Sequence, residues 1–127
     1  MNGYFGNIEK ETLANEFFRK VLYTDAKSQL VVMSLLPGEE IGSEVHAHLD
    51  QFLRFDYGEG NVTLVEKTLV VGDGDAVIVP AGVVHNVINT SSVPLKLYTI
   101  YTPPEHASDT VHKTKAEADL AEHEAHS

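Results

Sequence analysis

The chain has 127 residues, among which 19 acidic and 9 basic side chains give a formal net charge of -10. A surface of this charge repels nucleic-acid phosphates and anionic membrane faces, so we expect neither a nucleic-acid partner nor a membrane partner. The sequence has no cysteine, no apolar run approaching the roughly 20 residues of a membrane span and no basic-then-apolar leader, and it therefore predicts a cytoplasmic protein with a single domain.

The chain divides by composition into three expected parts, of which the first two extend to residue 104. Residues 1–16 are mixed in character and are expected to form an N-terminal arm that lies over an edge strand or a partner subunit. Residues 17–104 consist of short β-branched and aromatic runs separated by Gly, Asp, Asn and Pro, a rhythm typical of an all-β sandwich or barrel. The expected strands are Phe17–Tyr23, Gln29–Leu36, Glu44–His48, Gln51–Tyr57, Asn61–Glu66, Lys67–Val71, Asp75–Val79, Val84–Asn89 and Leu95–Tyr101.

The third part, residues 105–127, is expected to be a C-terminal tail rich in Ala, Glu, Lys and His. Thr114 followed by Glu117 has the spacing of a capping box, which predicts a helix from about Lys115. The apolar stripe of this helix is thin, so a frayed or disordered end beyond Leu120 is an equal alternative.

Two segments carry residues at fixed spacing. The second reads G-x5-P-x-G-x2-H-x3-N and is formed by Gly74, Pro80, Gly82, His85 and Asn89. Five fixed positions within 16 residues rarely arise by chance. The glycines and the proline suit turns, the asparagine is expected to close a turn through its side chain, and the histidine is a candidate metal ligand.

The first segment has the spacing G-x5-H-x-H-x(3,4)-E-x6-G, but two residue types depart from that pattern. The positions are Gly38, Glu44, His46, Gln51 and Gly58, with Glu in place of the first His and Gln in place of Glu. Together the two segments resemble the motifs of the cupin superfamily. The resemblance covers about residues 29–101.

The resemblance implies an all-β fold, a double-stranded β-helix or jelly-roll cupin barrel over residues 17–104, with a short C-terminal helical or disordered tail. In such barrels a metal is held inside by residues of both motifs. Small members of this size, of the mannose-6-phosphate-isomerase-like type, are commonly homodimers that exchange or pack N-terminal strands. A homodimer with a small-molecule ligand is therefore expected, and residues 4–23 are available for the exchange.

Five side chains are candidates for binding metal or moving protons. On a strand, Glu44, His46 and His48 project from one face. Gln51 joins them after a turn, and His85 arrives from a distant part of the chain and can converge with them in a barrel. Imidazole and carboxylate ligands suit Fe, Mn, Ni, Co, Cu or Zn, so we expect one divalent transition metal per chain.

Two registers of the first motif are possible. In one, His46 and His48 form the HxH pair, which requires two slips in spacing. In the other, Glu44, His46 and Gln51 occupy the three ligand positions and every interval fits; the ligand set also keeps its single negative charge. We therefore predict Glu44, His46, Gln51 and His85 as metal ligands. His48 is then a rim residue, an alternate ligand or a catalytic base.

A structural interpretation stands beside the metal one. Glu44 can form an ion pair with Arg54 or Lys96 inside the barrel, and Gln51 can satisfy backbone groups. The remaining histidines are interpreted as hydrogen-bonded surface or core residues; they are His106, His112, His123 and His126.

Because cupins have many activities, function must be argued from the site, and three hypotheses remain open. The first is a metal-dependent enzyme that isomerises or opens a sugar or sugar acid through an acidified hydroxyl or water. Candidate anchors for a carboxylate or phosphate of its ligand are Arg54, Lys96, Tyr57, Tyr98 and Tyr101. The second is an oxygen-dependent dioxygenase that uses Glu44, His46 and His85. The third is a non-catalytic ligand-binding module.

The dioxygenase hypothesis has its own candidate lining for an apolar substrate. These residues are Leu35, Phe52, Leu53, Phe55, Val77, Val79 and Val87. A filled jelly-roll core explains the same residues and is the simpler interpretation.

Overall fold

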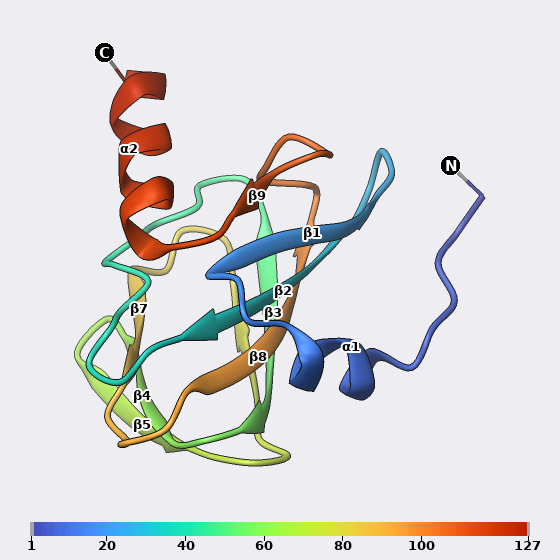
Figure 1. Cartoon of the computed structure of the whole chain (residues 1–127). Helices are drawn as coiled ribbons and strands as arrows, with labels where there is room; N and C mark the ends of the chain where they lie inside the picture. Colours follow the sequence, from blue (N-terminus) through green and yellow to red (C-terminus); the bar gives the residue numbers. More distant parts are fainter. Residues whose placement is uncertain (1, 127) are drawn as a thin grey trace.

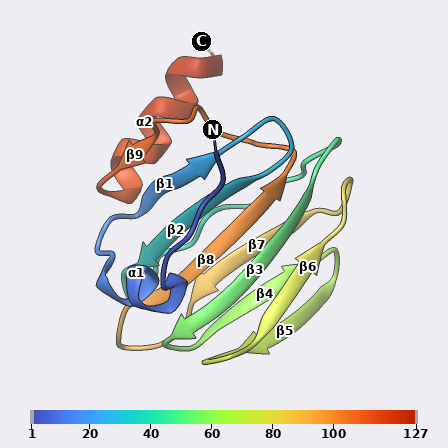
Figure 2. The same ribbon diagram turned by 90° about the vertical axis from the view of Figure 1, so that its right-hand side faces the viewer.

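A computed structural model of the chain describes residues 2–126, and two antiparallel sheets face each other in it (Figures 1 and 2). The elements are α1 (Ile8–Ala14), β1 (Arg19–Thr24), β2 (Gln29–Leu35), β3 (Asp50–Tyr57), β4 (Gly60–Leu64), β5 (Lys67–Val71), β6 (Ala76–Val79), β7 (His85–Asn89), β8 (Leu95–Thr102), β9 (Val111–His112) and α2 (Lys115–His126). The larger sheet has the order β6-β3-β8-β2-β1-β9 and the smaller one the order β5-β4-β7. The predicted all-β jelly-roll barrel is confirmed.

Alternation of side chains places the core between the sheets. In β8 every second residue from Leu95 to Tyr101 is buried, and β3 alternates in the same way. Most of the apolar lining considered for a dioxygenase substrate is core, whereas Phe52 lies on the other face of β3, against the ring of Tyr98. The buried hydrophobic cluster is made of Phe18, Val31, Met33, Leu35, Leu49, Leu53, Phe55, Val62, Val71, Val77, Val79, Val87, Leu95, Leu97, Tyr101 and Ala118.

The pairing register separates an apolar end of the barrel from a polar end. At one end Leu35 of β2 is opposite Leu95 of β8, and both are fully buried. At the other end Tyr101 of β8 lies between Gln29 of β2 and Gln51 of β3, and all three are buried. A row of buried polar groups requires hydrogen-bond partners, so this end of the barrel is where polar chemistry is concentrated.

The strand predictions hold for every expected strand except Glu44–His48, which is wrong. Only Glu44 makes a bridge, with His85, and residues 47–48 form a turn. The chain must pass here from the smaller sheet to β3 of the larger one, so a straight five-residue strand has no room to continue. The face shared by Glu44, His46 and His48 therefore does not exist.

The N-terminal arm contains α1, which the sequence did not predict. Asn7 caps it by accepting a hydrogen bond from the backbone of Lys10 at 3.0 Å. The helix packs on the outer face of the larger sheet, mainly against β8 (Figure 2). Lys96 of β8 holds its C-terminal end, because its ammonium donates to the carbonyls of Leu13 and Asn15.

The C-terminal tail adds β9 and α2 to the barrel. β9 pairs with β1, and Ala118 of α2 is buried in the core. The predicted capping box is confirmed: Thr114 Oγ1 accepts from the backbone N–H of Glu117 at 3.1 Å, and Glu117 accepts from the backbone of Lys113. Within the described chain, neither helix is long and apolar enough to cross a membrane.

Gly58, the last residue of the first motif, has a structural role. Its φ is +90°, and a Cβ there would lie 2.6 Å from the backbone oxygen of Pro94. We expect Gly58→Ala to lower the free energy of unfolding by at least about 2 kcal/mol, from backbone strain and this clash. Gly72→Ala is the control, because a Cβ there meets nothing closer than 3.8 Å. Urea denaturation of the two variants checks this; equal stabilities would contradict it.

Candidate metal site

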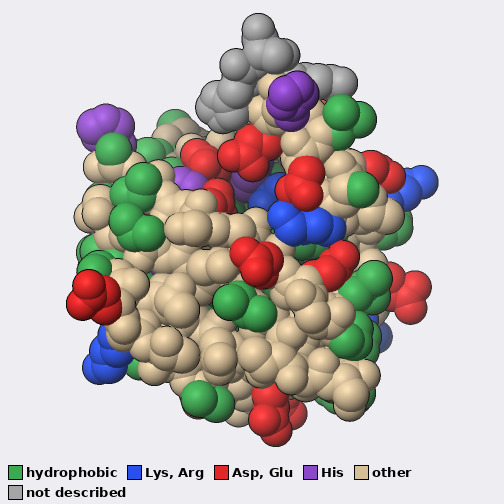
Figure 3. Space-filling model, turned by 90° about the vertical axis from the view of Figure 1, so that its left-hand side faces the viewer, with side chains coloured by type: hydrophobic (Ala, Val, Ile, Leu, Met, Phe, Trp, Pro, Cys, Tyr) green, Lys and Arg blue, Asp and Glu red, His purple; other side chains and the backbone are tan. Residues whose placement is uncertain are grey.

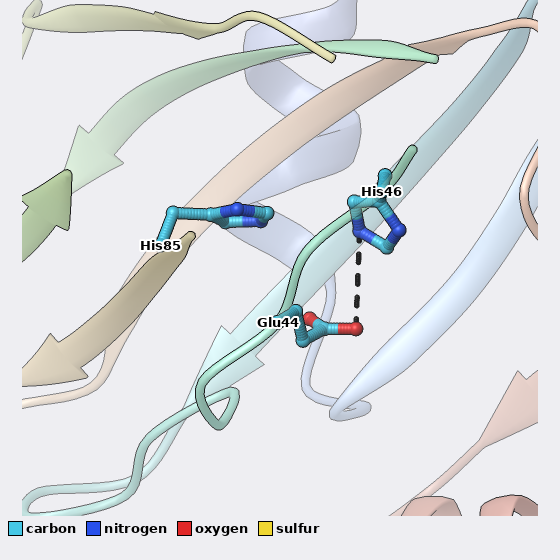
Figure 4. Close-up of side chains that lie close together, drawn as sticks. All are labelled: Glu44, His46 and His85. Atoms are coloured by element: carbon cyan, nitrogen blue, oxygen red, sulfur yellow. Dashed lines mark ion pairs between the residues drawn. The ribbon is translucent and has the colours of Figure 1, made fainter. Parts of the chain in front are cut away.

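Three potential ligands, Glu44, His46 and His85, meet at the polar end of the barrel (Figure 4). Glu44 and His85 form an isolated antiparallel bridge with backbone hydrogen bonds of 2.8 and 2.9 Å. Residues opposite each other in such a bridge project to the same side, so the carboxylate and the imidazole share one side. His46 lies two residues further on, and one ligand atom of each residue lies within 4.8 Å of the other two.

The imidazole of His46 is held in the orientation and tautomer that suit a metal. Its Nδ1 lies 3.2 Å from Glu105 Oε2, and because the carboxylate accepts, Nδ1 carries the proton. Its Nε2 is buried, has no hydrogen-bond partner among the described residues and lies 3.9 Å from Glu44 Oε2. The hydrogen bond to Glu105 raises the pKa of His46, while burial works against that rise.

His85 also turns a lone pair toward the site. Its Nδ1 lies 2.9 Å from the carbonyl oxygen of Val83, to which it donates. Its Nε2 lies 3.1 Å from Gln51 Oε1, while Gln51 Nε2 donates to Thr99 Oγ1 at 3.0 Å. Burial lowers the pKa of His85, which favours the neutral ring. In this tautomer two acceptor atoms face each other, and a cation bound by both would satisfy them.

Glu44 completes the set with a carboxylate. Burial raises its pKa, and the electrostatic interactions with His46, in its protonated form, and with Arg19 oppose that rise. The ion pair considered for it with Arg54 or Lys96 is wrong, because Arg54 lies 3.5 Å from Asp56 and Lys96 binds backbone carbonyls.

The chemistry of the donor set and the distance between His46 and Glu44 fit a transition metal. Two ligands on opposite sides of an ion, each about 2.1 Å from it, are about 4.2 Å apart. The 3.9 Å between His46 Nε2 and Glu44 Oε2 lies within that limit. Two imidazoles, one carboxylate and one amide oxygen are ligands that Fe, Mn, Ni, Co, Cu and Zn accept.

His48 does not join the three ligands. It lies in the turn before β3 and is exposed. It lines a surface groove with His46, Pro104 and Glu105. This position is that of a rim residue.

Sequence reasoning missed Glu105, which lies in the part treated as a tail. Gln29, fully buried at the start of β2, holds this part of the chain in place: its Oε1 accepts from the backbone of Glu105 and His106, and its Nε2 donates to the carbonyl of His106. No local spacing links Glu105 to His46. The only available signal was a glutamine at an inward position of a strand, which needs distant partners.

The chain was compared with protein families and with individual proteins. A family model described as a cupin domain matches residues 31–101. The Bacillus subtilis protein YrkC is 48% identical over 122 residues, which cover 91% of this chain and 66% of YrkC. A protein of Acanthamoeba polyphaga mimivirus is 41% identical over 108 residues, 81% of this chain and 67% of that protein. The chain thus spans about two thirds of the length of these two relatives.

The fold is also found in solved structures. The crystal structure of a Bacillus halodurans protein superimposes with a TM-score of 0.90 at 46% identity, covering 92% of this chain and 93% of that one. This match covers more of the chain than residues 31–101, the range of the family model.

Glu105 provides a test of how the imidazole of His46 is positioned. We expect Glu105→Ala to weaken metal binding by roughly 10–100-fold, because the ring loses the partner that fixes its tautomer. Glu105→Gln keeps an acceptor and should restore part of the affinity. Titration with Co(II) or Zn(II) against a chelating dye measures this. Glu66→Ala, at an exposed turn, is the control, and an unchanged Kd in Glu105→Ala would contradict the positioning role.

Proposed function

The chain belongs to the cupin family, and on that basis we propose that it is a metal-dependent enzyme acting on a small polar molecule such as a sugar or sugar acid. Glu44, His46, Gln51 and His85 would hold one divalent transition metal. One observation carries this proposal: the buried Nε2 of His46 has no hydrogen-bond partner among the described residues, and it lies with Glu44 and with His85, whose Nε2 faces Gln51 Oε1, in one cluster.

A metal bound there supplies a Lewis acid that acidifies a bound hydroxyl or water. The residues of the chain supply orientation and proton transfer. Glu105 holds the His46 ring, and Gln51, anchored on Thr99, presents a neutral and weaker ligand. His48, on the rim, is the proposed base that exchanges protons with the ligand.

The polar lining of the site favours a polar substrate rather than an apolar one. It therefore supports isomerase-type or lyase-type chemistry. The inward residues beside the ligands are Gln29, Thr99 and Tyr101, all buried. Burial raises the pKa of Tyr101, so its hydroxyl stays protonated and can donate a hydrogen bond. The apolar side chains further inside are packed into the core, which leaves the polar end for the ligand.

A dioxygenase is the second candidate, because Glu44, His46 and His85 are two histidines and one carboxylate. This is the arrangement of oxygen-activating Fe(II) sites. A non-catalytic module would use the same residues for structure alone.

Metal content distinguishes the two registers of the first motif. We expect Glu44→Ala to lose most of its metal, because the carboxylate supplies the only negative charge among the four proposed ligands. His48→Ala should retain it, because this side chain is exposed and outside the cluster. Elemental analysis of the purified variants measures both. Loss in His48→Ala with retention in Glu44→Ala would overturn the proposed ligand set.

The reaction class is tested on the metal-loaded protein with and without oxygen. Turnover of sugars or sugar acids under anaerobic conditions with Mn(II), Ni(II) or Zn(II) is the expected result. Stoichiometric iron with oxygen consumption would replace this proposal by the dioxygenase. A chain that cannot be loaded with any of these metals, and whose melting temperature does not rise on their addition, would favour the non-catalytic module.

A further inference from the structure

Arg19, the first residue of β1, points into the barrel. It is paired with Met33 of β2, and residues opposite each other in an antiparallel pair project from the same face. Met33 is fully buried in the core, and Arg19 itself is only 8% exposed. Lys20, the next residue, is exposed on the other face. A guanidinium inside a small barrel is costly unless it is paired, so its surroundings need an explanation.

Among the described residues, the guanidinium of Arg19 has an aromatic ring and an imidazole as its nearest partners rather than a carboxylate in direct contact. Its Nη1 donates to His112 Nδ1 at 3.2 Å, and the ring of Phe18 lies 5.3 Å from its central carbon. Its Nε is buried without a hydrogen-bond partner, and it forms no ion pair with any carboxylate in the part of the chain that the structure describes. An imidazole and an aromatic face do not neutralise its charge.

The start of β1 lies next to the segment that leads to Glu44. Lys115 donates to the carbonyl of Ile41 and lies 5.7 Å from the ring of Phe18, over which the guanidinium of Arg19 also lies. In agreement with this placement, the charge of Arg19 acts to lower the pKa of Glu44.

The ring of Tyr101 lies between the metal cluster and His106, since it is edge-on to His46 at 6.0 Å and to His106 at 5.3 Å. Figure 3 shows that histidine, acidic and basic side chains gather in a recess of the molecular surface.

A second unsatisfied polar atom lies in the same surroundings. His106 Nε2 is buried and has no hydrogen-bond partner among the described residues. Burial, followed by the charge of Arg19, lowers the pKa of His106 to about 4, so the ring is neutral at pH 7. Two buried nitrogen atoms without hydrogen-bond partners among the described residues, Arg19 Nε and His106 Nε2, mark a place where a polar ligand would complete the hydrogen bonding.

We propose that Arg19 is the anion-binding group of this site and that the small molecule bound at the metal cluster carries a carboxylate. The proposal rests on the proposed function and narrows its substrate class to acids. The guanidinium fork pairs with both oxygens of a carboxylate. A hydroxyl or carbonyl next to that carboxylate would then face Glu44, His46 and His85.

The charges around Arg19 favour a carboxylate over a phosphate. Glu44 and Glu105 bring two negative charges to the site, and Arg19 with a bound divalent metal would bring three positive ones, which leaves one positive charge in excess. A carboxylate has one negative charge and balances this excess. A phosphate near pH 7 has almost two negative charges and exceeds it.

The other anchors considered from the sequence do not serve this role. Arg54 pairs with Asp56, and Lys96 binds the end of α1. Tyr57 is exposed, and Tyr98 lies against Phe52 on the outer face of the sheet. Among those five, only Tyr101 points inward, next to the site.

The test uses the full chain loaded with Co(II), whose visible absorption reports on its ligands. Glycolate is titrated against glycolamide, its neutral counterpart. We expect Arg19→Gln to raise the Kd for glycolate by about tenfold or more while the Kd for glycolamide stays the same, because the bond to a charged group is lost. Its affinity for Co(II) should be equal or higher, since a nearby positive charge is removed. Lys20→Gln removes the same charge from the outer face and should change neither Kd.

The outcomes separate this inference from the proposed function. Failure of the wild-type chain to bind Co(II) would overturn both. Stoichiometric Co(II) with equal Kd values for glycolate in wild type and Arg19→Gln would overturn only the role of Arg19, as would an equal effect of Lys20→Gln. If Arg19→Gln does not fold, Arg19→Lys replaces it, since it keeps the charge and loses the fork; an unchanged Kd for glycolate there would also overturn the inference.

Discussion

Two backbone hydrogen bonds between Glu44 and His85 hold the two halves of the candidate site together. They join the loop before β3 to the first residue of β7, and they place a carboxylate and an imidazole on one side of the chain. The turn at residues 47–48 then leads into β3, which brings Gln51 to the same His85. The site is therefore built on the backbone of the barrel rather than on freely moving side chains, and preorganisation of this kind is what a metal site requires.

The two ends of the barrel have different roles: the apolar end stabilises the fold, and the polar end carries the candidate site. Around Leu35 and Leu95 the interior is apolar and close-packed, so it supplies the hydrophobic free energy of folding. Around Gln29, Gln51 and Tyr101 the interior is polar, and its stability depends on satisfied hydrogen bonds. The glutamines meet this need through backbone and side-chain partners, whereas some atoms of the histidines and of Arg19 are left without partners.

Spacing and alternation predicted the elements whose signals are local. Asn89 illustrates this: its side chain donates to Val93 and accepts from Ser91, closing the turn after β7 as the motif suggested. The strand predicted for Glu44–His48 was wrong. Side chains alternate between two faces only while the chain stays extended, and here the chain turns. Alternation could not have placed Arg19 either, since Phe18 and Arg19 are consecutive and both buried at the point where β1 begins. Their burial depends on pairing with β2 and β9, which no local pattern encodes.

The charges at the polar end of the barrel couple the binding of the metal to the binding of the carboxylate. With Glu44 and Glu105 ionised, Arg19 leaves the cluster with an excess negative charge, which attracts a divalent cation and repels a carboxylate. A bound divalent cation reverses the sign of that excess, so a carboxylate is then attracted by both the metal and the guanidinium. By linkage, whatever factor the metal adds to the affinity for the acid, the acid adds to the affinity for the metal. The buried guanidinium of Arg19 thus destabilises the protein only until the metal and the acid are bound. The binding of the metal and the binding of the acid are therefore cooperative.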